Sequence, residues 1–488
     1  MQLEQELESP AQDDTPRSSE TDSSSRFASS TLRELLRVAV PLIISSGSQS
    51  LMHVIDRIFL TWHSVDAVAA SLPSGMLYWA VLSFPFGTAV YTNTFVAQYT
   101  GSGKPDRVTA SLWQGVRFAL VAGLLLSCCG MFAKQMLSWT GHTGAVGRME
   151  AEYFAASSYG ALPALLSVVL SAFFGGRGRT VVIMYVHIIT SIINGIFDYA
   201  LIFGVGPFPA MGIAGAAWGT NIANVVACGL FGWLTVKAMR SEGYPVWQTW
   251  RFDRELTLRM LRFGLPTGFQ YLVDVGAFLV FTVFVGRLGT TELAATTIAF
   301  NLNSMAFIPM FGLGTAVLTV VGRRIGEKRK DEAARTAWYG FGVATVYMGV
   351  FIILYLTTPH LMLLPYAASS DPAQFDAVRP LVVVLLRFVA LYSFFDAMAI
   401  VFGSAIRGAG DSQFSLWWTF GTSWALMVIP TWYAAQHGTA NLMNCWWAAS
   451  LYIFVLGLGF LARFLHGKWR TMTVMGHDHE PATVHVAG

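Results

Sequence analysis

The chain has 488 residues, of which 54% are hydrophobic and only 12% are charged, against about 25% charged in soluble globular domains. Its formal net charge of +3 is too small to indicate a nucleic-acid-binding protein. The four cysteines lie in apolar stretches and lack the spacing of a disulfide framework or a zinc site. These values exclude an ordinary cytosolic protein and predict one that lies in a membrane.

The first 30 residues are rich in serine and acidic side chains, with eight of the former and seven of the latter. Such a composition is typical of a disordered segment and lacks the basic start and apolar core of a signal peptide. We therefore expect residues 1–31 to form a disordered cytoplasmic tail.

From residue 32 onward the sequence is a series of apolar stretches, each about the 20 residues that a helix needs to cross a membrane. Twelve are counted, which predicts an all-α polytopic membrane protein. The expected spans are 36–62, 71–97, 108–133, 150–173, 181–204, 211–237, 258–286, 295–321, 334–357, 377–403, 413–434 and 443–466.

The lysines and arginines of the predicted loops indicate the orientation of the chain. With the N-terminus inside, the inner loops hold fourteen of them and the outer loops four. Cationic loops tend to stay in the cytoplasm. A multi-pass protein of the cell membrane with both termini in the cytoplasm is therefore expected.

An internal repeat at an offset of 225 residues divides the chain into two halves. The matched positions are Pro41 and Pro266, Phe59 and Phe284, Gly87 and Gly312, Gly101 and Gly326, and Asp106 and Asp331. Six spans in each half predict two six-helix lobes related by a pseudo-two-fold axis along the membrane normal, with a binding cavity between them. The expected segments are an N-lobe of residues 32–237, a linker of 238–257, a C-lobe of 258–466 and a cytoplasmic tail of 467–488.

Acidic residues inside predicted spans are the strongest functional signal, because a charge in the membrane is costly and usually faces a protein interior or water. In the first half, Asn194 and Asp198 share one face of a helix, and Asp56 lies on the first span. A buried carboxylate can load and unload a proton, whereas clustered oxygens suit a small hard cation. Both alternatives stay open from the residues alone.

The second half has a comparable set. Tyr392 precedes Asp396 by four residues on one helical face, and Asp274 lies on the first span of that half. The alternative is structural: each acid forms an interhelical hydrogen bond or an ion pair with an arginine. The candidate partners are Arg57, Arg117, Arg287 and Arg387.

Pro41 and Pro266 lie near the starts of their spans. A packing kink is one interpretation and a moving bend is the other. Lys104 follows a glycine-rich stretch but lacks the upstream glycine of a phosphate loop, so no ATP site is predicted. No catalytic motif indicates an enzyme.

These residues resemble the multidrug and toxic compound extrusion (MATE) family, most closely its NorM-like branch, over about residues 32–466. The matching fragments are Val38 to Pro41, Val54 to Asp56, Asp66 to Ala70, Asn194 to Asp198, Pro209 to Ala217, Gly264 to Pro266 with Asp274, Ala299 to Asn301, Pro309-Met310, and Asp396 with Ile406 to Gly408.

The resemblance implies a secondary active antiporter that exchanges H⁺ or Na⁺ for amphipathic, often cationic, organic compounds, without ATP or a cofactor. It implies a cation or proton site at Asp56, Asn194, Asp198 and Thr220, and a second at Asp274, Tyr392 and Asp396, either of which would hold Na⁺. Pro41 and Pro266 would be the conformational bends. The expected partners are small organic substrates and membrane lipid, and the expected oligomeric state is a monomer.

Two features of the sequence qualify that resemblance. Family members of this branch usually have Glu where this chain has Asp274, whose side chain is one methylene shorter. A related two-lobe flippase for lipid-linked saccharides is the alternative function, because Arg57, Arg117 and Arg387 lie in predicted spans and would suit a pyrophosphate.

Overall fold

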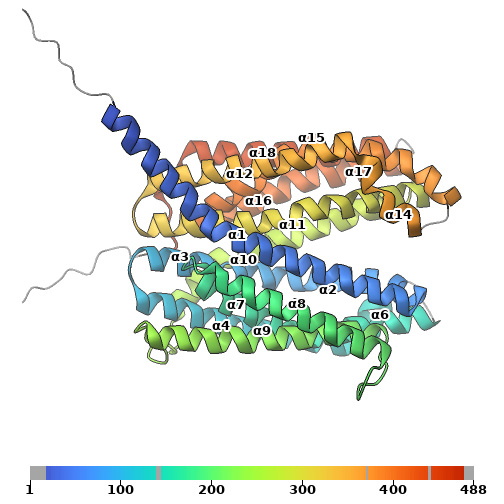
Figure 1. The fold of residues 1–488 in the computed structure, drawn as a ribbon, viewed down its shortest axis with the longest axis horizontal. Coiled ribbons are helices and arrows are strands. Elements are labelled where there is room, and N and C mark those ends of the chain that lie inside the picture. The colour runs from blue at the N-terminus through green and yellow to red at the C-terminus, as the bar shows by residue number, and fades with distance from the viewer. Residues whose placement is uncertain (1–17, 139–143, 370–371, 438–440, 477–488) are drawn as a thin grey trace, which may run out of the picture.

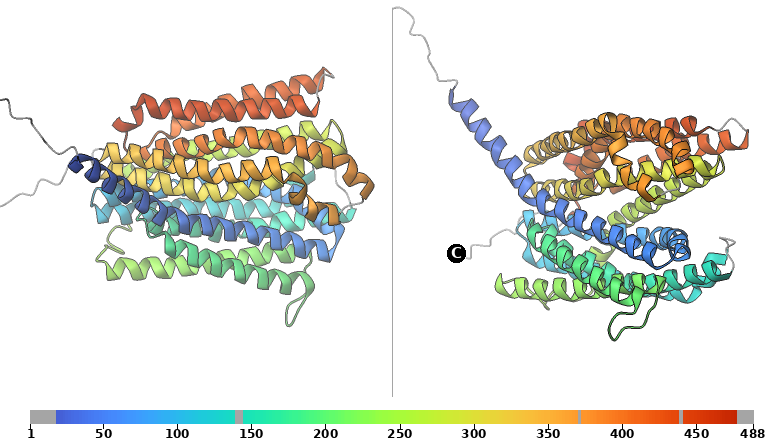
Figure 2. Two further views of the ribbon diagram at one scale, coloured as in Figure 1. Left: turned by 45° about the horizontal axis from the view of Figure 1, so that its top comes forward. Right: turned by 45° about the vertical axis from the view of Figure 1, so that its right-hand side comes forward.

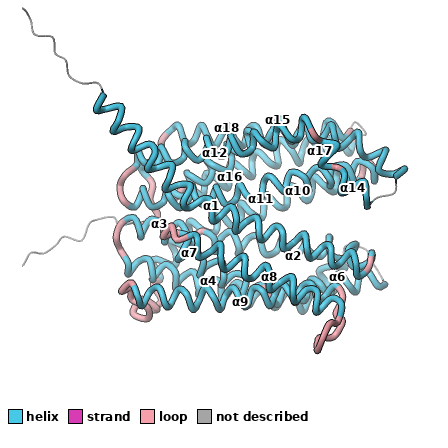
Figure 3. The backbone as a smooth tube through the Cα atoms, viewed as in Figure 1, coloured by secondary structure: helices cyan, strands magenta, loops and turns pink. Residues whose placement is uncertain are grey.

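The computed structural model describes residues 18–138, 144–369, 372–437 and 441–476, which form helices and loops without a strand in those ranges (Figure 1, Figure 3). We call α1–α9 the N-terminal bundle and α10–α18 the C-terminal bundle; the two lie side by side in all views (Figure 2). The N-terminal bundle contains α1 (Ser18–His63), α2 (Val65–Val90), α3 (Thr92–Gly101), α4 (Pro105–Cys129), α5 (Ala133–Leu137), α6 (Gly144–Tyr159), α7 (Ala161–Gly175), α8 (Thr180–Phe203) and α9 (Ile213–Ser241). The C-terminal bundle contains α10 (Arg254–Gly286), α11 (Thr290–Gly326), α12 (Lys330–Thr357), α13 (Pro359–Met362), α14 (Leu364–Ser369), α15 (Pro372–Ala409), α16 (Ser412–Thr422), α17 (Ile429–Gln436) and α18 (Leu442–His466).

Ten helical stretches of the described chain are long and apolar enough to cross a membrane, or eleven if the bent pair α6 and α7 counts as one span. Their outer faces expose large apolar side chains such as Leu125, Ile192 and Val346, which suit contact with lipid rather than water. The protein is therefore an all-helical polytopic membrane protein, as the sequence predicts, although the sequence predicts twelve spans.

The predicted span 150–173 is divided between α6 and α7, which meet at a bend of 40°. Pro163 lacks the N–H that would bond to the fourth residue before it, Tyr159, so the helix is weakened at this point. Gly160 lies at the break, and the Asn221 side chain of α9 approaches so closely that its Nδ2 donates to the Ala156 carbonyl at 2.7 Å. The bend is therefore stabilised by a side chain from another helix, which hydropathy does not reveal.

The predicted span 413–434 is also interrupted. It forms α16, a π-helical segment at Ser423–Val428, and α17. Pro430 follows the π-helical segment and cannot donate to the carbonyl of Leu426. This local change in winding is why residues 412–436 are not counted among the continuous apolar helices of the described chain.

Both ends of the described chain extend structure into segments that the sequence assigns to tails. α1 begins at Ser18, because a helix leaving the membrane can continue through polar residues in water. After α18, a 3₁₀ turn at Lys468–Thr471 is followed by Val474 and Met475, which are buried. The backbone N–H of Val474 donates to Oε1 of Gln98 on α3 at 3.0 Å, so residues 468–476 connect the two bundles.

We call the end of the molecule that contains Gln98 and residues 468–476 the terminal end. There the bundles touch through backbone atoms at glycines. A Cβ built on Gly101 would lie 2.1 Å from the carbonyl oxygen of Arg323, and one built on Gly326 would lie 2.1 Å from that of Gln98. Since Gln98 and Arg323 are themselves 225 residues apart, the contact is reciprocal: each half presents the same positions to the other.

A second reciprocal contact lies about 14 residues, or ~21 Å, further along the same helices. A Cβ on Gly87 of α2 would meet the backbone of Gly268 on α10 at 3.0 Å. Its counterpart, Gly312 of α11, faces the backbone of Leu42 and Ile43 on α1, at 2.7 Å from a built Cβ. The bundles are thus in close backbone contact from the terminal end to near the middle of these long helices.

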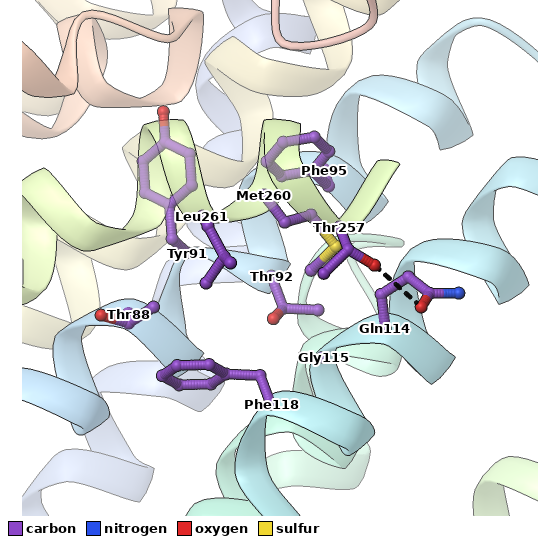
Figure 4. Close-up of a pocket in the computed structure, with 10 residues that line it drawn as sticks. All are labelled: Thr88, Tyr91, Thr92, Phe95, Gln114, Gly115, Phe118, Thr257, Met260 and Leu261. Atoms are coloured by element: carbon purple, nitrogen blue, oxygen red, sulfur yellow. Dashed lines mark hydrogen bonds between the residues drawn. The ribbon is translucent and has the colours of Figure 1, made fainter. Parts of the chain in front are cut away.

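Only a small void remains between the bundles near the terminal end (Figure 4). It has a volume of about 20 Å³ and lies between α2, α3 and α4 on one side and the start of α10 on the other. Thr257 of α10 donates to Oε1 of Gln114 on α4 at 3.0 Å across this junction. The void has room for about one water, and ligand pockets are an order of magnitude larger. The bundles are therefore packed together at this level.

Candidate ion-coupling site

Two acidic side chains from different helices meet inside the N-terminal bundle. Asp56 lies on α1 and Asp198 on α8, and their carboxyl groups are within hydrogen-bonding reach of each other. Asp198 is fully buried, and neither of its oxygens accepts a well-aligned hydrogen bond within the described chain. Two carboxylates in contact repel each other unless a proton or a cation accompanies them. The pair is therefore arranged to hold one of these.

Backbone approach fixes the position of this pair. Gly215 and Gly219 on α9 are four residues apart and face α8. A Cβ at position 219 would lie 1.8 Å from Oδ1 of Asp198, and one at position 215 would lie 2.6 Å from the carbonyl carbon of Leu201. Small residues at this spacing let membrane helices approach closely. α9 thereby forms one wall of the carboxylate site.

Asn194 and Thr220 complete the site as the sequence predicts their helices to allow. Nδ2 of Asn194 donates to Oγ1 of Thr220 at 3.3 Å, and that hydroxyl donates to the Ala216 carbonyl at 3.1 Å. Oδ1 of Asn194 is buried without a donor, and Asn194 also interacts with Asp198. The structure thus brings all four predicted N-terminal residues together, as a group of oxygen acceptors short of donors.

Two further residues border this group and carry no signal in the sequence. Tyr153 on α6 interacts electrostatically with both Asp56 and Asp198. His53, one turn before Asp56 on α1, places Nδ1 3.9 Å from Oδ2 of Asp56, and its side chain is 68% exposed. A tyrosine or histidine in an apolar span is an ordinary residue until the rotation of the helix is known. Its role follows only from the fold.

The acids of the C-terminal bundle are arranged differently. Tyr452 on α18 donates from its hydroxyl to Oδ1 of Asp274 on α10 at 3.4 Å. The same tyrosine interacts electrostatically with Asp396 on α15, which is 9% exposed. Tyr452 therefore stands between the two acids. The sequence analysis did not identify it, because nothing in its apolar helix distinguishes it from a packing residue.

Tyr392 and Arg407 are the other polar neighbours in this bundle. Tyr392 is buried and interacts with Asp396, as predicted from their shared helical face, and also with Tyr355. Arg407 interacts electrostatically with Asp274 and donates to Oε1 of Gln270 at 3.3 Å. The predicted C-terminal residues are thus linked through tyrosines and lie near a cation.

None of the arginines named as structural partners forms an ion pair with these four acids in the described chain. Arg117 instead donates to the carbonyl of Arg251 and lies over the ring of Trp250, at the junction with the segment before α10. Arg57 and Arg387 are exposed. The search for three or more His, Cys, Asp or Glu side chains around one point finds none among the described residues. A cation at either site would therefore need amide, hydroxyl, backbone or water oxygens besides the acids.

Both predicted bends adjoin the reciprocal contacts between the bundles. Pro41 directly precedes Leu42, which faces Gly312, and Pro266 directly precedes Thr267, whose carbonyl oxygen lies 3.0 Å from a Cβ built on Gly87. Each proline leaves one backbone carbonyl of its helix without a partner N–H. The two helices are thus weakened next to the points at which the bundles touch.

The family model described as MatE matches the chain twice, over residues 41–200 and 266–433. The two matches begin 225 residues apart, which is the offset of the internal repeat. The chain is also similar to the probable multidrug resistance protein NorM of Thermotoga maritima, with 26% identity covering 91% of this chain and 95% of that one. A protein of the same description from Pseudomonas putida is 28% identical, covering 91% and 96%.

Solved structures give the same fold. A MOP superfamily transporter from Pyrococcus furiosus, described as having a binding pocket of reverse polarity that suggests a different function, superposes with a TM-score of 0.82 at 20% identity, over 91% of this chain and 97% of that one. An outward-facing multidrug resistance MATE family transporter superposes with a TM-score of 0.78 at 19% identity, over 89% and 96%.

Proposed function

The chain belongs to the MatE family of membrane transporters, and we propose that it is a secondary active multidrug efflux transporter. It exchanges H⁺ or Na⁺ for amphipathic, often cationic, organic compounds. The curated relatives named NorM support the choice of substrate class. As a transporter it is not an enzyme, and neither ATP nor a cofactor takes part in the proposed cycle.

The observation that carries this proposal is the contact between Asp56 and Asp198. The two acids come from different helices, lack well-aligned donors and are buried from water. They can take up a proton or cation from one side and release it to the other when the helices move apart. One elementary charge that crosses 100 mV supplies about 2.3 kcal/mol, which can drive efflux.

Alternating access follows from two lobes that rock against each other. We propose twelve transmembrane helices in two six-helix lobes related by a pseudo-two-fold axis along the membrane normal. The reciprocal glycine contacts and the paired matches to the family model support it. In the present state the terminal end is closed, and bending at Pro41 and Pro266 would open it.

The terminal end is proposed to face the cytoplasm, with both termini on that side of the cell membrane, since most of the loop arginines and lysines lie there. The expected unit is a monomer. The lobes are proposed to comprise residues 32–237 and 258–466, joined by the linker 238–257, with the tails at 1–31 and 467–488.

A transport assay with separate gradients tests this function. Purified protein in vesicles is given a fluorescent cationic dye, and a proton gradient and a sodium gradient are imposed one at a time. Gradient-driven dye movement under one of them supports the antiporter and names its ion. Folded protein that moves no dye under either gradient would contradict the proposal.

The alternative, a flippase for lipid-linked saccharides, would need cations converging on the cavity. Arg117 packs against Trp250 and Arg251 instead, and Arg57 and Arg387 lie on helices of different bundles. Their placement does not favour a common pyrophosphate site. Accumulation of lipid-linked intermediates in cells that lack the protein would reverse this preference.

A further inference from the structure

A large cavity lies at the terminal end, apart from the candidate ion sites. Its volume is about 710 Å³, and it lies between the start of α1, the loop that joins α7 to α8, and the end of α11. Its charged lining residues are Arg33, Glu34, Arg37, Arg177, Arg179 and Arg323. Five guanidinium groups thus surround one space, with a single carboxylate among them.

Ion pairs neutralise only part of this charge. Glu242 pairs with both Arg177 and Arg179, and Glu34 pairs with Arg323 at 3.0 Å. Arg33 and Arg37 are exposed and form no ion pair with any described residue. Five arginines therefore face two carboxylates, which leaves an excess of three positive charges. The cavity is built for an anion.

The internal repeat gives this cavity a counterpart in the C-terminal bundle. Adding 225 to Glu34, Val38 and subtracting it from Arg323 gives Arg259, Phe263 and Gln98. The loop residues Arg177-Gly178 correspond to Arg407-Gly408 in the same way, at a slightly larger offset. All these counterparts come together at the terminal end.

That counterpart is filled by the chain itself. Thr473 and Val474 both donate to Oε1 of Gln98, and Arg259 donates to the carbonyl of Met475. Val474 also lies against Gly410, whose other neighbour is Phe263. In the C-terminal bundle a peptide segment occupies the position. In the N-terminal bundle the same position is lined by arginines and holds no described segment of the chain.

The depth of the cavity indicates the kind of anion. Ser30 to Val38 begin the first apolar helix, and Arg177 to Arg179 lie between two others, so the lining is at the ends of the apolar stretches. That is the level of lipid headgroups. Arginine forks match the oxygens of a phosphate group, and basic pockets between membrane helices bind anionic headgroups.

We propose that this cavity binds a phosphate-bearing anion at the membrane surface, namely the headgroup of an anionic phospholipid. Arg33 and Arg37 supply the guanidinium groups that are not already paired, and Arg177, Arg179 and Arg323 provide a positive floor held by Glu34 and Glu242. The ligand would join α1 to α8 and α11, across the junction between the two bundles.

Native mass spectrometry of the full-length protein tests this proposal by counting retained lipids. Wild-type protein, the double variant Arg33→Gln with Arg37→Gln, and a control double variant Arg240→Gln with Arg254→Gln are each titrated with phosphatidylglycerol or phosphatidylcholine. The control arginines are exposed, lie at the same end and are outside the cavity. Because none of the four forms an ion pair with a described residue, each variant is expected to fold; a monodisperse elution profile checks this.

We expect wild-type protein and the control to retain one phosphatidylglycerol at similar concentrations and to retain phosphatidylcholine poorly. The cavity variant should need at least tenfold more phosphatidylglycerol. Competition by millimolar inorganic phosphate or glycerol phosphate, lost in the same variant, would assign the site to soluble phosphates as well as lipid.

Equal retention by the wild type and the cavity variant would overturn the proposal, and so would equal retention of the two lipids. The acidic segment 1–17 offers another occupant, since it holds five Asp and Glu residues. If lipid binds only after these five are neutralised in the full chain, the tail rather than a headgroup occupies the cavity and the proposal fails. None of these measurements depends on transport.

Discussion

The two bundles share one architecture but place their acids in different surroundings. In the N-terminal bundle Asp56 and Asp198 touch, with acceptor oxygens around them and no ion pair to Lys or Arg in the described chain. In the C-terminal bundle Tyr452 lies between Asp274 and Asp396, and Arg407 acts on Asp274. The first arrangement is incomplete without a proton or cation, whereas the second is largely balanced by its own residues. We therefore expect the N-terminal site to carry the coupling ion.

The largest expected effect comes from removing one acid of the touching pair. Asp198→Asn leaves a side chain of nearly the same size that cannot exchange a proton or balance a cation, so gradient-driven dye efflux should fall to the level of empty vesicles. Asp66→Asn, an exposed acid at the start of α2, is the control and should retain efflux. Full efflux by Asp198→Asn, together with loss in Asp396→Asn, would transfer the coupling role to the C-terminal bundle.

A change beside the pair tests whether its geometry matters as well as its charge. In Gly219→Ala the new methyl would overlap Oδ1 of Asp198, and overpacking of this kind costs about 1–3 kcal/mol. We expect roughly tenfold slower efflux and a lower unfolding temperature. Gly229→Ala, on the same helix with nothing within 4 Å of a built Cβ, should leave both unchanged. Equal behaviour of the two variants would show that α9 does not position the carboxylate.

The C-terminal comparison is sharpened by Tyr452→Phe, which removes only the hydroxyl that bonds to Asp274. A hydrogen bond contributes about 0.5–1.5 kcal/mol, so a change in dye efflux of about two- to tenfold is expected. Tyr433→Phe, on an exposed tyrosine of α17, is the matched control. Complete loss of efflux in Tyr452→Phe would mean that the two bundles are equally essential.

The smallest expected effect concerns the contact between the bundles. Gly101→Ala would place a methyl against the Arg323 carbonyl and disfavour the state that is closed at the terminal end. Spin labels at positions 240 and 466, one in each bundle, would report a longer mean distance than in the parent. Gly349→Ala, whose built Cβ has nothing within 4 Å, should keep the parent distance. An unchanged distance in Gly101→Ala would contradict the closing role of this contact.

The sequence predicted the membrane class, the repeat and the convergence of Asp56, Asn194, Asp198 and Thr220 because these rest on period, offset and the cost of charge in lipid. It could not predict Tyr153 or Tyr452, since both depend on how neighbouring helices are rotated. The breaks at Gly160 and at Ser423–Val428 were missed for a related reason. Hydropathy averages over a window, whereas a proline and one side chain from another helix decide the local winding.

Residues 468–476 show a further limit of sequence reasoning. Their composition is that of a polar end, and the sequence analysis assigned them to a tail. Their hydrogen bonds to Gln98 and Arg259 exist only because the two bundles meet at that point. A segment whose partners lie hundreds of residues away carries no local signal for its placement.

The reciprocal glycine contacts make the response to mutation one-sided. Glycine has no smaller replacement, so any substitution at Gly87, Gly101, Gly312 or Gly326 can only add volume where two backbones already touch. Every such change acts in the same direction, against the state that is closed at the terminal end. Laboratory evolution that needs this gate tighter must therefore find its gains elsewhere, while looser variants are one nucleotide change away at any of four codons.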